Sequence, residues 1–553
     1  MSPSKVMAAS VAACALLASS AMGAPPVKAD VARSAEHMKA HMTFLASDLL
    51  EGRDSGSPGF DIAAEYVASQ FRQLGLTPAG DNGTYFQKVP LWASRPTDKG
   101  AVVVKGPGGD VALVFGEDYF PGRTPVAGET RVSAPMVFVG YGVVAPEHGR
   151  DDYRGLDVKG KIVVALSGAP GGLQTEERAY YANGRTKRRE AGKHGAIGFI
   201  SLETPLGEKL RPFDQGLRTW DTWGMTWRGP DGRPFDAAPD VPGLAGLSVK
   251  GATKLFANAP TTYDQVIAAV DATGAPPRFA LPGTVDVKIS SETKLVESRN
   301  VIAILPGSDP KLKDEVIVLS AHLDHIGITK PVKGDSINNG ALDNAAGVAT
   351  TLEVARAFTE ARKRPRRSIM FLTVTGEEKG LLGAEYFARN PTVPLKNIAG
   401  DVDIDMPVLT YDFTDVVAFG ADRSGIGPAV RRAAERVGLK LSGDPMPEEG
   451  LFTRSDHYRF VEVGVPAVFL MTGFANGGEK AFRSFLANCY HKPCDDLSQP
   501  IDYVAGAKFA RINYEITREL TDMAKRPTWN AGDFFGEKYA GANAPTRAPS
   551  GAK

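Results

Sequence analysis

The second half of this 553-residue chain alternates short apolar runs with amphipathic stretches, and this alternation most constrains its fold. The apolar runs have strand length and lie at 301–305, 316–320, 369–374, 398–404, 416–419 and 467–471. Helical spacing returns between or after them at 345–361, 381–389, 428–437 and 501–525. Strands that alternate with helices predict a three-layer α/β fold, with a mostly parallel sheet covered on both faces. In such sheets, chemistry collects at polar residues just beyond the carboxyl ends of strands.

The segments outside this unit differ in texture. Residues 35–130 predict two helices followed by connecting β structure, and we assign them to the same catalytic unit as residues 285–525. Residues 131–284 carry short β-rich runs broken by glycine, with short helices between them, and predict an inserted α+β domain. Residues 526–553 are rich in alanine, glycine, proline and lysine, and predict a flexible tail.

The first 24 residues predict a signal peptide for export to the periplasm or the medium. Lys5 precedes an apolar stretch at 6–17, and small residues follow at 18–24. The alternative is a membrane anchor, but the stretch is shorter than the ~20 residues that a membrane span needs. Cleavage leaves only Cys489 and Cys494, for which an oxidising compartment favours a disulfide over two free thiols.

The composition excludes other classes of protein. Lysine plus arginine and aspartate plus glutamate number 64 each, so the chain lacks the broad basic surface of a nucleic-acid-binding protein. Three cysteines are too few for a scaffold built on disulfides. A chain of this length can instead bury a large hydrophobic core.

Five polar clusters indicate a metal site only when they are taken together, and two of them come first along the chain. The first, SAHLDH at 320–325, follows an apolar run, and Asp324 can accept the spare N–H of a metal-binding His322. An ordinary surface pair is the alternative. The second is a loop at 338–347 that leads into a helix and contains Asp343, whose alternative role is to cap that helix.

Three further clusters follow the same pattern. Glu377 and Glu378 follow a strand, where two adjacent carboxylates repel each other unless a cation or a proton intervenes; an acidic helix start is the alternative. Asp401, Asp403 and Asp405 alternate at the end of another strand and therefore lie on one side of it. The last cluster is His491, which lies between the two cysteines. Imidazole and carboxylate ligands without thiolate suit hydrolytic zinc.

In these segments the chain resembles the co-catalytic di-zinc aminopeptidase family, which includes exported bacterial aminopeptidases and aminopeptidase Y. The matching segments are 321–325, 339–347, 375–382, 404–406, 454–460 and 490–493. Residues 50–53 resemble the N-terminal segment of the family. Residues 151–163 resemble a protease-associated domain, which is often inserted in these enzymes.

The resemblance implies two zinc ions per chain and a role for each site residue. His322 and His491 would bind one ion each, Asp343 would bridge the two, and the remaining ligands would be Glu378 and Asp405. Glu377 would act as the general base, Asp324 would orient His322, and Tyr490 would stabilise the oxyanion. Asp456 and His457 would line the substrate side. The chain departs from the family at Asp403, where asparagine is common, and at Pro407.

The implied activity is an exopeptidase that removes N-terminal residues from peptides with a free N-terminus. A carboxypeptidase or dipeptidase of the same family is an alternative, because its chemistry is identical. A glutaminyl cyclase would use one zinc ion, and a transferrin-receptor-like binding protein would have lost the ligands that this chain keeps. The sequence sets neither the side-chain preference, nor the role of the inserted domain, nor the oligomeric state.

Overall fold

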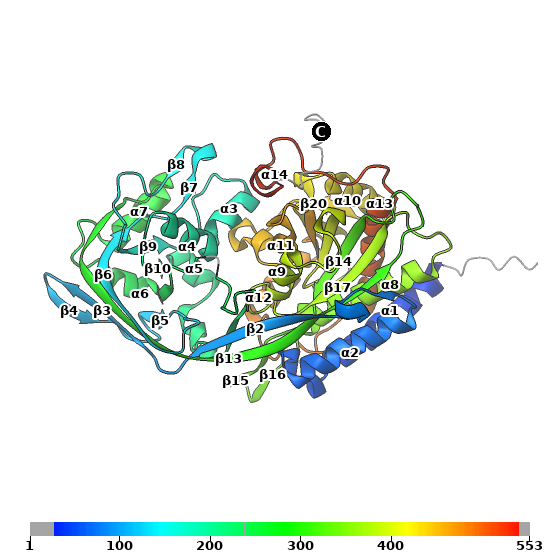
Figure 1. The fold of residues 1–553 in the computed structure, drawn as a ribbon, viewed down its shortest axis with the longest axis horizontal. Coiled ribbons are helices and arrows are strands. Elements are labelled where there is room, and N and C mark those ends of the chain that lie inside the picture. Colours follow the sequence, from blue (N-terminus) through cyan, green and yellow to red (C-terminus); the bar gives the residue numbers. More distant parts are fainter. Residues whose placement is uncertain (1–26, 237, 541–553) are drawn as a thin grey trace, which may run out of the picture.

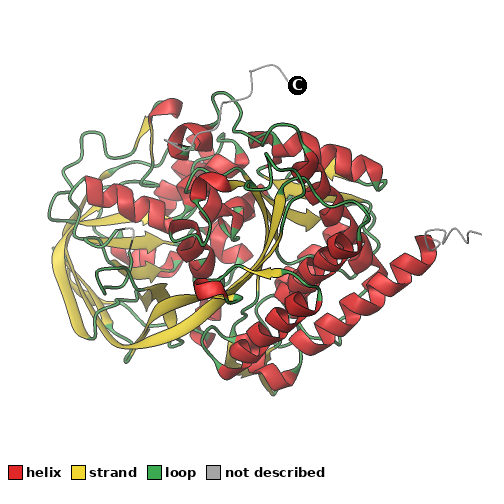
Figure 2. Cartoon of the chain, turned by 45° about the vertical axis from the view of Figure 1, so that its right-hand side comes forward, coloured by secondary structure: helices red, strands yellow, loops and turns green. Residues whose placement is uncertain are grey.

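The structure, a computed structural model, describes residues 27–236 and 238–540, which form two lobes (Figure 1). The catalytic lobe contains the C-terminal half of the chain together with helices α1 (Val27–Leu45) and α2 (Pro58–Gln73). The accessory lobe contains most of the residues between 97 and 283. Two long antiparallel strands, β2 (Phe86–Pro96) and β13 (Phe279–Leu305), run beneath both lobes and connect them (Figure 2).

The catalytic lobe is built on a mixed sheet with a parallel centre. Strands β17 (Ser368–Val374), β14 (Val316–His322), β18 (Ile398–Ile404) and β21 (Ala467–Thr472) are mutually parallel neighbours in that order. Antiparallel neighbours lie on both sides, β13 beside β17 and β19 (Asp415–Phe419) beside β21, and β20 (Lys440–Ser442) pairs with β19. The four central strands are buried along their whole length, as expected for strands covered on both faces.

Helices cover both faces of this sheet, which confirms the predicted three-layer α/β class. On one face α1 packs with α8 (Ala346–Glu360) and α13 (Tyr503–Asp522), and α10 (Ile426–Arg436) lies against α13. On the other face lie α9 (Leu382–Arg389), α11 (His457–Val461) and α12 (Gly478–Asn488). Among the described residues no helix combines the length and the apolarity that crossing a bilayer requires.

The accessory lobe has its own sheet. Strands β6 (Gly128–Phe138), β9 (Ile162–Leu166), β10 (Gly198–Leu202) and β12 (Gly243–Leu247) are parallel neighbours, and β5 (Tyr119–Pro121) closes the edge in antiparallel orientation. Strands β3 (Ala101–Gly106) and β4 (Gly109–Ala112) extend the β13 side, so the lobe begins before residue 131. Its helices are α3 (Thr175–Ala182), α4 (Gly184–Lys193), α5 (Pro205–Leu210), α6 (Val249–Leu255) and α7 (Tyr263–Thr273).

One expectation about the chain ends is corrected. The predicted signal peptide lies outside the described residues, and helix α1 begins at Val27. Residues 526–540 are not a loose tail, because Trp529 is 2% exposed and α14 (Phe534–Tyr539) packs Phe535 against Phe452. The many small residues in this segment led to the prediction of a flexible tail, but its aromatic side chains are part of the core.

Candidate metal centre

Three parallel strands bring their carboxyl ends to one edge of the sheet, and the predicted ligands follow directly from that register. His322 ends β14 and is paired with Val374, three residues before Glu377. Asp403 on β18 is paired with Ser320, which places Asp405 one residue beyond the strand and close to His322. His322 Nε2 lies 3.0 Å from Asp405 Oδ1 and 3.3 Å from Asp343 Oδ1.

Asp343 occupies a central position between the two predicted histidine ligands. It lies in the one-turn segment η5 (Ala341–Ala345) that precedes α8, in a peptide with Asn344 that is cis. Its Oδ1 faces His322, and its Oδ2 lies 3.4 Å from Nε2 of His491. Asp343 is 3% exposed, and its side chain does not cap the helix, since Ala345 occupies the cap position.

Glu377 and Glu378 follow β17 and face different neighbours. The Glu378 carboxylate lies 2.6 Å from His325 Nδ1 and 3.1 Å from His491 Nε2. Glu377 lines a small pocket beside Asp343 and Asp405. Burial raises the pKa of Glu377 well above its ordinary value, and the carboxylates of Asp405 and Glu378 add to the rise although His322 opposes it.

Asp324 supports the site in a way that differs from the expected one. His322 Nδ1 contacts the backbone carbonyl of Asp324 at 3.0 Å rather than its carboxylate. The Asp324 carboxylate instead accepts the backbone N–H groups of Glu377 and Glu378, at 3.1 and 3.4 Å. Asp324 therefore orients His322 through its main chain and the glutamate pair through its side chain.

The three alternating aspartates of β18 are joined by two buried serine hydroxyls. Ser320 Oγ lies 2.9 Å from an Asp401 carboxylate oxygen and 3.0 Å from Asp403 Oδ1. Ser455 Oγ lies 2.6 Å from Asp403 Oδ2 and 2.8 Å from Asp405 Oδ2. Of these three aspartates, Asp405 is the one that contacts His322, and the other two are linked to it through the serine hydroxyls.

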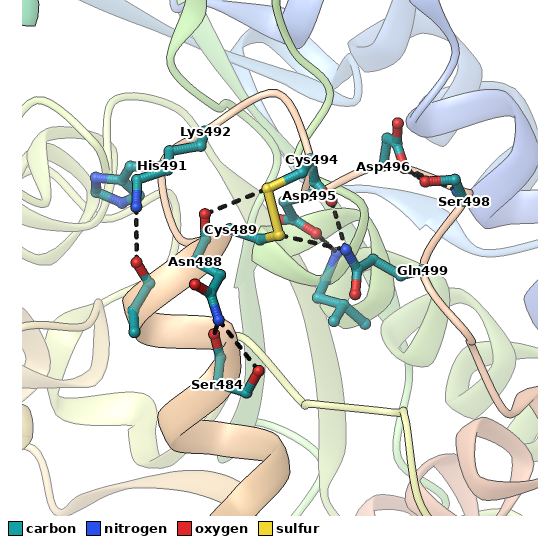
Figure 3. The surroundings of a disulfide bond; sticks show 12 residues. Ser484, Asn488, Cys489, His491, Lys492, Cys494, Asp495, Asp496, Ser498 and Gln499 are labelled. Carbon is teal, nitrogen blue, oxygen red and sulfur yellow. Dashed lines mark hydrogen bonds between the residues drawn. A yellow bond between two sulfur atoms is a disulfide. The ribbon is translucent and has the colours of Figure 1, made fainter. Parts of the chain in front are cut away.

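A short disulfide loop presents His491 and Tyr490. Cys489 and Cys494 form a disulfide with Cα atoms 5.1 Å apart, just after α12 (Figure 3). The rings of Tyr490 and His491 stack with centroids 3.7 Å apart, and Tyr490 Oη lies 3.4 Å from Arg454 Nη2. Burial raises the pKa of Tyr490, so its hydroxyl keeps its proton.

His325 is a member of the site to which the sequence gave no role. It is fully buried, and within the described residues neither of its ring nitrogens has a hydrogen-bond partner. Its Nδ1 nevertheless lies 2.6 Å from Glu378 Oε1, without the geometry of a hydrogen bond. Its place in the SAHLDH motif could have drawn attention to it. However, the spacing of the motif does not show whether His322 or His325 points towards Glu378.

The donor set fits a pair of divalent cations. Ligand atoms of His322, Asp343 and Asp405 lie within 4.8 Å of one another, and so do those of His325, Asp343 and Glu378. Asp343 belongs to both groups. Burial alone would lower the pKa of His491, but the Glu378 and Asp343 carboxylates raise it to about 9. The carboxylates therefore demand positive charge at this position, and zinc suits nitrogen and oxygen donors of this kind.

Two further residues that sequence reasoning missed hold the ligand loops. Arg53 is 1% exposed and donates to the carbonyls of Leu323, Asn339 and Gly340, at 2.9, 2.7 and 3.1 Å. Asp495 accepts the backbone N–H groups of Leu342 and Asp343, at 2.9 and 3.0 Å. Both stand far in sequence from these backbone groups, so the resemblance of residues 50–53 to the family singled out the segment of Arg53 without showing its contacts.

Asp456 and His457 do not contact the substrate side, which corrects the expectation. Both side chains are 0% exposed and neither lines the pocket. The His457 ring packs between Phe452 and Phe469, with centroids 5.1 and 5.5 Å away. Asp456 and His457 stand at the start of α11, and their side chains are buried in the protein. Arg454, two residues before Asp456, lines the pocket instead.

A small pocket and a large cavity meet at the metal centre. The pocket has a volume of about 30 Å³ and joins Asp343, Glu377 and Asp405 to an apolar wall of Met406, Leu451, Phe469 and Met471. It shares Met406, Leu451, Arg454, Tyr490 and His491 with a cavity of about 1020 Å³. The site is therefore closed on one side and open on the other.

Comparison with known proteins agrees with this geometry. A "Probable zinc metalloprotease" of Pyricularia oryzae is 32% identical over 267 residues, or 42% of this chain and 52% of the relative. Aminopeptidase Y of Saccharomyces cerevisiae is 27% identical over 223 residues, or 38% and 36%. The chain thus spans about half or less of the length of these curated relatives.

A solved structure shares the fold of nearly the whole chain. The aminopeptidase from Aneurinibacillus sp. strain AM-1 aligns over 88% of this chain and 94% of its own, with a TM-score of 0.52 and 21% identity. At this identity the likeness concerns the fold alone.

The histidine and carboxylate groups at the parallel strand ends lie in the part of the chain that these comparisons match. Residues 300–517, which contain every predicted metal ligand, match the model of peptidase family M28.

Proposed function

We propose that the protein is a di-zinc aminopeptidase that removes N-terminal residues from peptides. The observation that carries this proposal is the buried set of metal-binding groups at the parallel strand ends, in which Asp343 belongs to both groups of ligand atoms. Glu377 lines the small pocket beside Asp343 and Asp405 and is free to exchange a proton. The similarity to aminopeptidase Y supports the same direction of attack.

Five side chains would hold the metal ions: His322, Asp343, Glu378, Asp405 and His491. When bound, zinc supplies a Lewis acid that acidifies water and polarises a carbonyl group. Glu377 accepts the proton of the attacking water and passes it to the leaving nitrogen, a role that its place in the small pocket beside Asp343 and Asp405 supports. Tyr490 keeps its phenolic proton and donates it as a hydrogen bond to the developing oxyanion.

We include export in the proposal. The predicted signal peptide would deliver the chain to an oxidising compartment, where the Cys489–Cys494 disulfide is stable. We also propose that the accessory lobe is a protease-associated domain, which the resemblance of residues 151–163 supports.

One observation favours the carboxypeptidase or dipeptidase alternative. Arg454 lines the small pocket together with the carboxylates, and a guanidinium can bind a terminal carboxylate. Arg454 also lies 3.1 Å from Glu449 Oε2, so its charge already has a partner. A panel of peptides with free, acetylated or amidated ends, combined with zinc analysis of the same sample, separates these activities. Aminopeptidase action requires the free N-terminus and two zinc ions per chain, whereas a glutaminyl cyclase would need one ion.

Glu377→Gln provides the sharpest test of the mechanism. We expect this variant to retain zinc and to lose activity by about 100-fold or more, because the amide cannot accept the proton. Glu435→Gln, on the exposed side of α10, serves as the matched control and should behave as wild type. Near-native peptide hydrolysis by zinc-loaded Glu377→Gln would show that another group is the base.

A further inference from the structure

The large cavity opens beside the small pocket and the candidate metal centre. Its floor is shared with the small pocket through Tyr490 and His491. Its opposite wall comes from the accessory lobe, namely α5 and the one-turn helix η4 (Phe213–Arg218). A peptide that extended from the small pocket into this cavity would therefore contact the accessory lobe.

This cavity is strongly basic. Six lysine and arginine side chains line it besides Arg454, against the two acidic residues Asp214 and Glu449: Lys209, Arg211, Arg218, Lys330, Arg483 and Lys492. Three of the six have carboxylate partners, since Arg211 pairs with Glu449, Arg483 with Glu479 and Lys330 with Asp221. Among the residues that the structure describes, the other three have no carboxylate within 4.0 Å.

Arg218 is the cation best placed to meet a substrate. It is half-buried and reaches from η4 to the catalytic lobe, where it donates to the carbonyl of His491 and to Thr329 Oγ1, the latter at 3.2 Å. A guanidinium has five N–H donors, so three remain for another acceptor. Lys492 follows His491 and places a second positive charge nearby.

Both cations line the same cavity. Lys492 Nζ donates to the carbonyl of Ala487 at 2.8 Å, so its hydrogen-bond partner is neutral. A carboxylate bound in this part of the cavity would supply the missing negative charge and would form charge-assisted hydrogen bonds with both side chains.

We propose that Arg218 and Lys492 bind a carboxylate on the leaving part of the peptide, so that the preferred substrates are short peptides with a free C-terminus or peptides with an acidic side chain after the scissile bond. This inference rests on the proposed function, because it assigns the cavity to the leaving part of a peptide. It gives the accessory lobe a direct share in substrate selection.

Calorimetric binding to the zinc-loaded Glu377→Gln protein tests the inference without turnover. One pair of ligands is Ala-Gly-Gly and its C-terminal amide, and the second pair is Ala-Glu-Gly amide and Ala-Gln-Gly amide. We expect the acidic member of at least one pair to bind about tenfold more tightly, which is the effect of one charge-assisted hydrogen bond. The pair with the larger ratio identifies the source of the carboxylate.

Adding Arg218→Ala should reduce this ratio to about one, and Arg218→Lys should restore part of it. Arg483→Ala is the matched control, because this cavity arginine already pairs with Glu479, and it should keep the full ratio. Zinc content is measured on the same samples, since damage to the position of His491 would weaken both members of a pair without changing their ratio.

The outcomes separate the two proposals. Equal affinities within both pairs, or an undiminished ratio in the Arg218→Ala protein, overturn the carboxylate site. A preserved tenfold ratio that Arg218→Ala abolishes supports the site, even if the wild-type enzyme fails to hydrolyse any peptide with a free N-terminus. That failure would contradict the aminopeptidase proposal alone.

Discussion

At the scale of single residues, the candidate metal centre consists of histidine rings that lie close to carboxylates. His322 and His491 face carboxylates at 3.0 to 3.4 Å, and His325 faces Glu378 at 2.6 Å without a hydrogen bond. A proton or a cation between two atoms that approach so closely would relieve their repulsion. Ligand atoms of His325, Asp343 and Glu378 lie within 4.8 Å of one another, so we expect His325 to support zinc on the Glu378 side, a role that the sequence did not assign to it.

His325→Ala should weaken zinc binding by about 10- to 100-fold on the Glu378 side, the range seen when groups that support a metal ligand are removed. Competition with a zinc chelator, followed by metal analysis, measures the effect. His148→Ala, in the accessory lobe, is the control and should leave the affinities for both zinc ions unchanged. Two equally tight zinc ions in His325→Ala would show that this ring only fills space.

The residue scale also shows what a sequence can and cannot predict. The structure brings together His322, Asp343, Glu378, Asp405 and His491, because each stands at a strand end or in a loop that the apolar pattern locates. Arg53 and Asp495 escaped prediction because their partners are backbone groups elsewhere in the chain. Asp456 and His457 were misplaced because a motif gives the order of residues and not the direction of their side chains.

At the scale of elements, strands with continuous apolar runs were the most predictable features. The fold class followed from them, since strands covered on both faces show no alternation of polar residues. Short elements that depend on aromatic packing were not predictable, and α14 with Trp529 is the example. In that segment tertiary contacts, rather than composition, decide the structure.

The disulfide loop after α12 gives a prediction at this scale. The loop between Cys489 and Cys494 carries Tyr490 and His491, and closing it limits the positions that His491 can take. Replacing both cysteines with serine should weaken zinc binding by about tenfold while α12 remains folded, because a mobile ligand must be ordered on binding.

Zinc titration and circular dichroism check this expectation. Reduction of the wild-type protein should reproduce the effect, and the doubly substituted protein should be insensitive to reductant. Unchanged zinc affinity in the serine protein would show that packing of Tyr490 alone orders His491.

At the scale of the whole molecule, buried ion pairs hold the accessory lobe against the catalytic lobe. Arg423 of the catalytic lobe contacts the Glu176 carboxylate and lies 3.2 Å from Glu177 Oε1, both of which belong to α3. Arg185 of α4 pairs with Glu385 of α9 at 2.9 Å. Because Arg218 reaches the metal centre from the accessory lobe, these contacts also fix the cavity that we assign to the leaving peptide.

Arg423→Met should loosen this interface. Glu176 and Arg423 are 9% and 8% exposed, and removing one partner of a buried pair costs about 3–5 kcal/mol because the other charge stays buried. Arg431→Met is the matched control, since Arg431 is exposed and its ion-pair partner within residues 27–236 and 238–540 is the exposed Asp422 at 3.9 Å, a pair worth about 0–1 kcal/mol. Denaturant unfolding should show a less stable accessory lobe for Arg423→Met alone, with faster proteolysis in that lobe and unchanged zinc content. If Arg423→Met and Arg431→Met unfold alike, the lobes are held instead by the continuous strands β2 and β13, and the cavity keeps its shape without the ion pairs.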